Sequence, residues 1–83
     1  RLKAYPNPFN NKCRFIYNQP INGQLFIEIY DIRSNLILSF NKGFISKGNY
    51  EFDWNPKGIS SGIYFVQINS NNMISNNKII YLK

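Results

Sequence analysis

The chain has 83 residues, of which 43% are hydrophobic, which is enough for one small packed domain and too few for two separate cores. Its net charge is +6, and the sequence contains no histidine, so it lacks the commonest general base and the commonest metal ligand. No apolar run approaches the roughly 18 residues that a membrane-spanning helix needs. The single cysteine, Cys13, excludes an internal disulfide and is expected to be a small buried strand residue.

Positive charge is spread along the whole chain and forms no basic cluster. Dispersed lysines are typical of a solvated surface, so we do not expect binding to nucleic acid. The net charge suits anionic partners such as lipopolysaccharide or a membrane face. The only methionine is Met73, and the chain starts with another residue. We therefore expect it to be an excised part of a longer protein whose targeting signals lie elsewhere.

Alternating apolar and polar residues predict strands throughout, and no window shows the period of a helix. The predicted strands cover residues 13–17, 24–31, 35–40, 49–54, 63–69 and 77–83. Segments rich in Gly, Pro, Asn and Ser predict turns or loops at 18–23, 41–49, 55–62 and 70–72. Six or seven short strands with such turns predict an all-β, immunoglobulin-like antiparallel β-sandwich, and a small barrel is the alternative.

The alternation also predicts which side chains point inward. Trp54 shares a face with Tyr50 and Phe52, which favours a core position over an exposed sugar-binding one. The predicted core residues are Phe15, Tyr17, Leu25, Ile27, Ile29, Tyr50, Phe52, Trp54, Tyr64, Val66 and Ile68.

Residues with catalytic or metal-binding chemistry are few. The carboxylates fall in two strand pairs, Glu28 with Asp31 and Glu51 with Asp53. If their strands were neighbours, they could form a glycosidase or calcium site, but ordinary outward-facing strand positions are the preferred explanation. Ser60–Ser61 have no histidine to activate them. We therefore expect no catalysis, no cofactor and no bound metal.

The segment Tyr5–Asn10, with the sequence YPNPFN, contains two prolines between two aromatic residues. Each proline lacks an N–H group and restricts the residue before it, so we expect a stiff, extended arm that seals one sheet edge against aggregation. With a period near two, Tyr5, Asn7 and Phe9 would share one side. The two aromatic side chains would then dock on the sandwich while Asn7 hydrogen-bonds to free backbone groups.

Five short motifs occur in order along almost the whole chain. They are YPNPFN at Tyr5–Asn10, IEIYDI at Ile27–Ile32, DWN at Asp53–Asn55, SSGIYFVQI at Ser60–Ile68 and KIIYLK at Lys78–Lys83. In this order and spacing the chain resembles the type A C-terminal sorting domain of bacterial type IX secretion substrates, the Por secretion system family. It also resembles the closely similar immunoglobulin-like domain of the flagellar hook-capping protein.

Two positions depart from the family pattern. The family usually has a glycine after the YDI-x turn, where this chain has Ser34 and Asn35, and we expect Asn35 to supply a left-handed conformation. Where relatives often have Trp-Asn/Asp-Gly, this chain has Trp54, Asn55 and Pro56, which alters the loop without threatening the fold.

The resemblance implies a non-enzymatic secretion signal carried at the C-terminus of a larger passenger protein. It implies recognition by the outer-membrane translocon and its shuttle protein, and removal by a sortase-like surface protease that can join the passenger to anionic lipopolysaccharide. The passenger would reach the cell surface or the medium through the periplasm and the outer membrane. The implied signal residues are Tyr5, Pro6, Asn7, Pro8, Phe9, Asn10, Gly62, Ile63, Tyr64, Phe65, Lys78 and Lys83.

We assign residues 1–11 to a linker end and the arm, and residues 12–83 to one β-sandwich sorting domain. KIIYLK stops where a final strand would end, as a C-terminal signal should, and its lysines are expected to flank an edge that a partner strand could extend. The alternative function is a structural or assembly module, either hook-capping-like or an accessory domain of a surface enzyme. A carbohydrate-binding module is less favoured.

Overall fold

A computed structural model of the chain describes residues 2–83, which form strands and no helix. None of these residues belongs to a helix that is long and apolar enough to cross a membrane. The strands are β1 (Leu2–Tyr5), β2 (Cys13–Gln19), β3 (Gly23–Asp31), β4 (Leu36–Ile45), β5 (Gly48–Trp54), β6 (Gly62–Ser70) and β7 (Met73–Tyr81).

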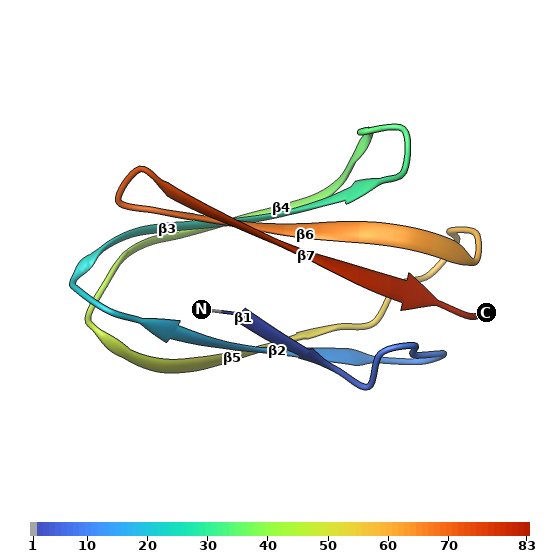
Figure 1. Cartoon of the computed structure of the whole chain (residues 1–83), viewed down its shortest axis with the longest axis horizontal. Helices are drawn as coiled ribbons and strands as arrows, with labels where there is room; N and C mark the ends of the chain where they lie inside the picture. The colour runs from blue at the N-terminus through green and yellow to red at the C-terminus, as the bar shows by residue number, and fades with distance from the viewer. Residues whose placement is uncertain (1) are drawn as a thin grey trace.

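The seven strands form two sheets that stack face to face (Figure 1). One sheet has the order β1-β2-β5 and the other the order β4-β3-β6-β7, and all pairings between these strands are antiparallel. The predicted all-β, immunoglobulin-like antiparallel sandwich is therefore confirmed.

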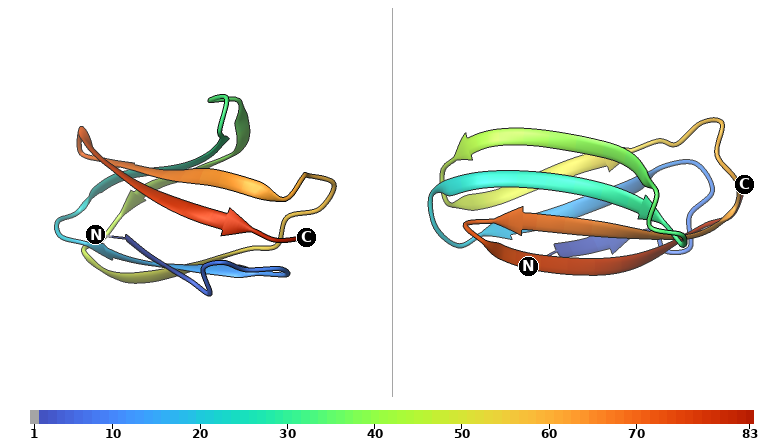
Figure 2. Two further views of the ribbon diagram at one scale, coloured as in Figure 1. Left: turned by 45° about the vertical axis from the view of Figure 1, so that its right-hand side comes forward. Right: turned by 90° about the horizontal axis from the view of Figure 1, so that it is seen from above.

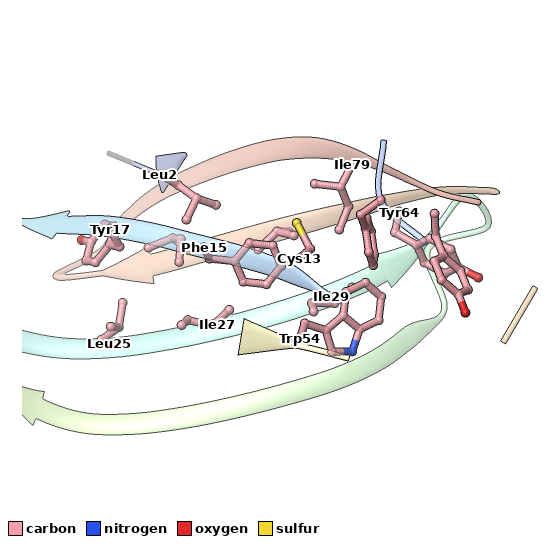
Figure 3. Packing of buried hydrophobic residues seen from close by; sticks show 14 residues of the cluster. Leu2, Cys13, Phe15, Tyr17, Leu25, Ile27, Ile29, Trp54, Tyr64 and Ile79 are labelled. Atoms are coloured by element: carbon pink, nitrogen blue, oxygen red, sulfur yellow. The ribbon is translucent and has the colours of Figure 1, made fainter. Parts of the chain in front are cut away.

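Alternate side chains of both sheets point into the space between them, where they form the hydrophobic core (Figure 3). Most of the predicted core residues are buried, as is Cys13. Tyr50 and Phe52 are only half-buried, because β5 is an edge strand with a neighbour on one side only. The buried core consists of Leu2, Phe9, Cys13, Phe15, Tyr17, Leu25, Ile27, Ile29, Trp54, Tyr64, Val66, Ile68, Ile79 and Tyr81.

Three strands differ from the prediction by more than two residues, and one of them, β7, begins at Met73 instead of at residue 77. Residues 2–5, which we assigned to the linker end and the arm, form strand β1 and pair with β2. β4 continues to Ile45 across the predicted turn segment 41–49. A register shift lets it do so: Leu25 faces Gly43 while Phe26 faces Asn41, which leaves Lys42 as an extra residue. Gly43 has a φ of 72°, a conformation that glycine adopts without strain.

The two ends of the sandwich are built from different connections (Figures 1 and 2). At the end that we call the arm end lie residues 6–12, the β3–β4 turn, the loop 55–61 and the C-terminal residues 82–83. At the opposite end, the hairpin end, lie the β2–β3, β4–β5 and β6–β7 turns.

Candidate functional site

An aromatic cluster holds four distant parts of the chain together at the arm end. The ring of Phe9, from the arm, lies 5.8 Å from that of Trp54 and 5.2 Å from that of Tyr81. Trp54 also contacts Tyr64 edge-on, with ring centroids 5.8 Å apart. All four side chains are buried, and Figure 3 shows Trp54 and Tyr64 among the side chains that fill this end of the core. Trp54 is thus a core residue and offers no open platform for a sugar ring.

The arm pairs with the outer edge of β7 as a short parallel strand. The Phe9 N–H donates to the Ile80 carbonyl at 2.9 Å, and the Leu82 N–H donates to the Phe9 carbonyl at 2.8 Å. These two bonds place Phe9 beside Tyr81, whose side chain also points inward. Because neighbours across a sheet share a face, Phe9 enters the core.

Asn7 extends this pairing by one step with its side chain. Its Nδ2 donates to the Lys78 carbonyl at 3.1 Å, and its Oδ1 accepts from the Ile80 N–H at 2.9 Å. The carboxamide of Asn7 therefore makes the two bonds that the backbone N–H and carbonyl of a residue beside Ile79 would make in a regular parallel strand.

The arm itself differs from its predicted shape. Residues 6–11 bend instead of running straight, and the Tyr5–Pro6 and Asn7–Pro8 peptide bonds are cis. Docking of Phe9 and hydrogen bonding by Asn7 occur as expected. Docking of Tyr5 was predicted wrongly: Tyr5 is the last residue of β1, opposite Arg14, and its side chain is 43% exposed.

The strand edge beside Lys78 was predicted to be open to a partner strand, and this prediction is wrong. Between Lys78 and Leu82 the outward backbone groups of β7 bind Asn7 and Phe9, so the chain's own arm occupies this edge. A partner strand could pair there only after the arm had left.

The start of β6 is tied to the C-terminal residues. The Tyr64 hydroxyl donates to the Ser60 carbonyl at 2.6 Å, and the Lys83 N–H donates to Ser61 Oγ at 2.7 Å. Burial raises the pKa of Tyr64, and the nearby negative charge of Asp31 raises it further. The motifs around YDI, SSGIYF and KIIYLK thus meet in one place although they are far apart in sequence.

Asp31 organises the β3–β4 turn. Its Oδ1 accepts from the Arg33 and Asn35 N–H groups at 2.9 and 2.8 Å, and Asn35 Nδ2 donates to Oδ2 at 3.0 Å. The hydrogen bond from the Asn35 N–H is the main reason that the pKa of Asp31 is lowered. The left-handed residue is Ser34, with a φ of 67°, and not Asn35 as predicted.

The four carboxylates do not converge. Glu28 and Asp31 lie on β3, whereas Glu51 and Asp53 lie on β5 in the other sheet. Asp53 accepts from Arg14 Nε at 2.9 Å, which lowers the pKa of Asp53. Among residues 2–83, His, Cys, Asp and Glu side chains form no group of three that could hold a metal ion. The paired-carboxylate and calcium hypotheses therefore have no geometric support.

The predicted signal residues divide by exposure. Most of the arm is exposed, as are Lys78 and Lys83, whereas Phe9 and Tyr64 are buried. Gly62, Ile63 and Phe65 are half-buried. A hollow of about 550 Å³ at the arm end is lined by Pro6, Pro8, Phe9, Asn10, Leu82 and Lys83. Exposed polar, charged and apolar groups from both chain ends thus share one surface, which we call the arm-end surface.

The ordered motifs lie within a region that matches a known protein family. Residues 3–82 match the family described as the secretion system C-terminal sorting domain. The chain belongs to this family. The type IX resemblance of the five motifs is thereby confirmed, whereas similarity to the hook-capping protein is not among the findings.

One solved structure carries the same fold. It is the crystal structure of dimeric latent PorU from Porphyromonas gingivalis, with a TM-score of 0.64 and 19% sequence identity. The match covers 98% of the sorting domain described here but only 9% of that chain. The match therefore supports the fold alone, and in PorU this fold is a small part of a much longer chain. No curated protein sequence matched the chain.

Proposed function

We propose that this domain is a non-catalytic C-terminal signal that directs a larger passenger protein across the outer membrane by the type IX system. The passenger would reach the cell surface or the medium. Family membership over residues 3–82 is the observation that carries this proposal. The translocon, its shuttle protein, a sortase-like protease and anionic lipopolysaccharide are the proposed partners.

The arm-end surface is the proposed contact with the export machinery. A receptor for an already folded domain can read only groups that folding exposes together. Asn10 and Lys83 are at opposite ends of the sequence, yet they line one hollow. This hollow forms only when Asn7 and Phe9 are seated on β7, so the surface distinguishes folded from unfolded domains.

The direct test fuses the domain to an unrelated folded reporter in a bacterium that has a type IX system. The wild-type fusion should appear at the cell surface or in the medium. If the fusion stays in the periplasm while folded and intact, the sorting function is excluded. The structural-module alternative would then take its place.

Surface variants then locate the signal. Lys83→Glu with Leu82→Asp changes two exposed groups of the arm-end surface, and we expect the exported fraction to fall at least tenfold. Lys47→Glu with Phe44→Asp is the matched control, because it makes the same two kinds of change at exposed positions near the hairpin end. Both variants should melt close to wild type, since surface substitutions usually change stability by about 0.5 kcal/mol or less. Normal export of the arm-end variant would show that the export machinery does not recognise the arm-end surface.

A further inference from the structure

The outer edge of β7 is closed along only half of its length. The arm occupies the half from Lys78 to Leu82. Among residues 2–83, no strand pairs with the half from Met73 to Asn77 on that side, and its contact with β1 of the other sheet is a hydrogen bond from Asn77 Nδ2 to the Leu2 carbonyl at 3.2 Å. Backbone groups alternate in direction along a strand, and those of Ile80 and Leu82 face the arm. By the same alternation, the N–H and carbonyl groups of Ile74 and Asn76 face outward. We call Met73–Asn77 the open half.

The open half is regular, in contrast to the edge strand at the other side of the same sheet. β7 pairs with β6 without a register shift from Met73 to Tyr81. β4 has two register shifts against β3, and such bulges twist an edge away from further pairing. The open half therefore keeps the straight backbone geometry that another strand needs.

An apolar groove runs beside the open half at the hairpin end. It has a volume of about 420 Å³, and its walls come from β2, the β2–β3 turn, β6 and β7. Ile21 and Ile74 are each 59% exposed and Met73 is 72% exposed, although they are large hydrophobic residues. Within residues 2–83, the side chains that line the groove carry no charge, so the groove suits an apolar group.

We propose that the open half binds an extended peptide segment of a partner protein, which pairs parallel to β7 and places one large apolar side chain in the groove. The arm shows how this works further along the same edge. There, the residue beside inward-facing Tyr81 is Phe9, and its side chain enters the core. A peptide residue beside Ser75, which also lines the groove, would by the same geometry enter the groove.

The hydrogen bonds of such a peptide follow from the parallel pattern. The peptide residue beside Ser75 would donate to the Ile74 carbonyl and accept from the Asn76 N–H, as Phe9 does with Ile80 and Leu82. Its neighbours would face outward, one of them next to the exposed side chain of Ile74. The expected ligand is thus an extended segment with apolar residues at alternate positions, the pattern of strand addition.

A second copy of the chain fits this edge less well. Two open halves aligned antiparallel over their full length would set Ser75 against Ser75 of the other copy. Two small hydroxyl side chains would then face a groove of about 420 Å³ and leave it largely unfilled. The groove favours a partner with a larger apolar residue at that position. This inference does not depend on the sorting role.

The test uses a fluorescently labelled octapeptide that alternates threonine with valine and phenylalanine. We expect saturable binding to the isolated chain below about 1 mM, measured by fluorescence polarisation. Amide chemical shifts of Ile74 and Asn76 should change on titration. Methylating the alternate peptide nitrogens that face β7 should abolish binding, whereas methylating the other set should not. The two methylated peptides have the same composition and differ only in which of the two hydrogen-bonding edges of the peptide is blocked.

Protein variants test the same contact from the other side. Asn76→Pro removes the outward N–H, a change that edge strands tolerate, and Ile21→Asp places a charge in the groove. Each should weaken binding at least tenfold. Ile32→Asp is the control, because Ile32 is an isoleucine at 68% exposure in a turn of the opposite end. Its affinity should stay within twofold of wild type, and melting curves check that all three variants fold.

Three results would overturn the proposal. The first is no binding at millimolar peptide, and the second is binding that neither Asn76→Pro nor Ile21→Asp weakens. The third is a concentration-dependent dimer of the chain that Asn76→Pro dissolves, which would make a second copy the occupant of the open half. Export of the reporter fusion is a separate readout, so failure here leaves the sorting proposal standing.

Discussion

The outer edge of β7 is covered at the arm end of the sandwich and exposed at the hairpin end. At the arm end, one buried aromatic ring and one carboxamide close the outer edge of β7. At the hairpin end no strand of residues 2–83 pairs with this edge, and Met73 and Ile74 are exposed beside it. The comparison shows that a short segment can protect a sheet edge without being a regular strand, provided that a side chain supplies the missing amide.

The largest expected difference between the ends is in packing. Trp54→Ala should lower the free energy of unfolding by about 3–5 kcal/mol, because it removes a buried ring that contacts Phe9 and Tyr64. Met73→Ala should change it by less than about 0.5 kcal/mol, since this side chain is 72% exposed. Urea unfolding measures both. Equal losses would show that the two ends are packed alike.

The next effect concerns the carboxamide. Asn7→Ala should cost about 1–2 kcal/mol, because two hydrogen bonds to β7 are lost. Asn7→Asp should cost at least as much, because its second carboxylate oxygen would lie against the Lys78 carbonyl oxygen, where Asn7 now donates a hydrogen bond. Asn10→Ala is the matched control, an exposed asparagine of the same arm, and should be nearly neutral. If the two alanine variants unfold alike, Asn7 does not hold the arm.

The alkylation rate of Cys13 can be used to measure whether the arm is docked on β7. Its thiol is buried, lies 3.6 Å from the Pro6 carbonyl, and has a pKa raised by burial to about 11. Because the thiolate is the reactive form, alkylation of the native protein at pH 8 should be much slower than that of the unfolded chain. Asn7→Ala should speed it about fivefold, which corresponds to roughly 1 kcal/mol of easier opening.

The control for this experiment is Ile21→Ala at the hairpin end. It should leave the alkylation rate of Cys13 unchanged, because the groove lies away from the arm. A similar acceleration in both variants would mean that alkylation follows unfolding of the whole domain and not release of the arm.

The smallest expected effect is a difference in how stability depends on pH, between the β3–β4 turn at the arm end and the turns at the hairpin end. The pKa of Asp31 is lowered in the folded state, chiefly by the Asn35 N–H, so its contribution to stability is present above its ordinary value of 3.8. That contribution is lost as the pH falls through the lower folded value. At the hairpin end Asn22 Oδ1 accepts from the Lys47 N–H at 2.8 Å and carries no charge.

Melting temperatures from pH 6 to pH 2 test this difference. The gap between wild type and Asp31→Asn should narrow below about pH 4, because the charge that distinguishes them disappears. The gap between wild type and Asn22→Ala should stay constant over the same range. A constant gap for Asp31→Asn would show that its ionisation does not support the turn.

Local alternation predicted most of the strands because a half-buried strand repeats every two residues. It missed β1, since four residues hold too few repeats, and it ended β4 early because Asn41 and Gly43 look like a turn. In the structure the same two residues form a bulge, in which Asn41 Oδ1 accepts from the Gly43 N–H at 2.9 Å. A residue pattern cannot distinguish a bulge from a turn, because the partner strand decides between them.

Residue alternation and the ordered motifs were enough to predict the strand pattern, most inward side chains and the family. The prolines of the arm also determined that this segment could not be a regular strand. The pairing of Asn7 with β7, the exposure of Tyr5 and the left-handed conformation of Ser34 depend on contacts that residue patterns do not contain. The tertiary structure also shows that, in the part of the chain it describes, no strand pairs with the outer edge of β7 at Met73–Asn77. The reason is physical: backbone alternation is a local property, whereas the occupant of a strand edge comes from a segment about 70 residues away in the chain.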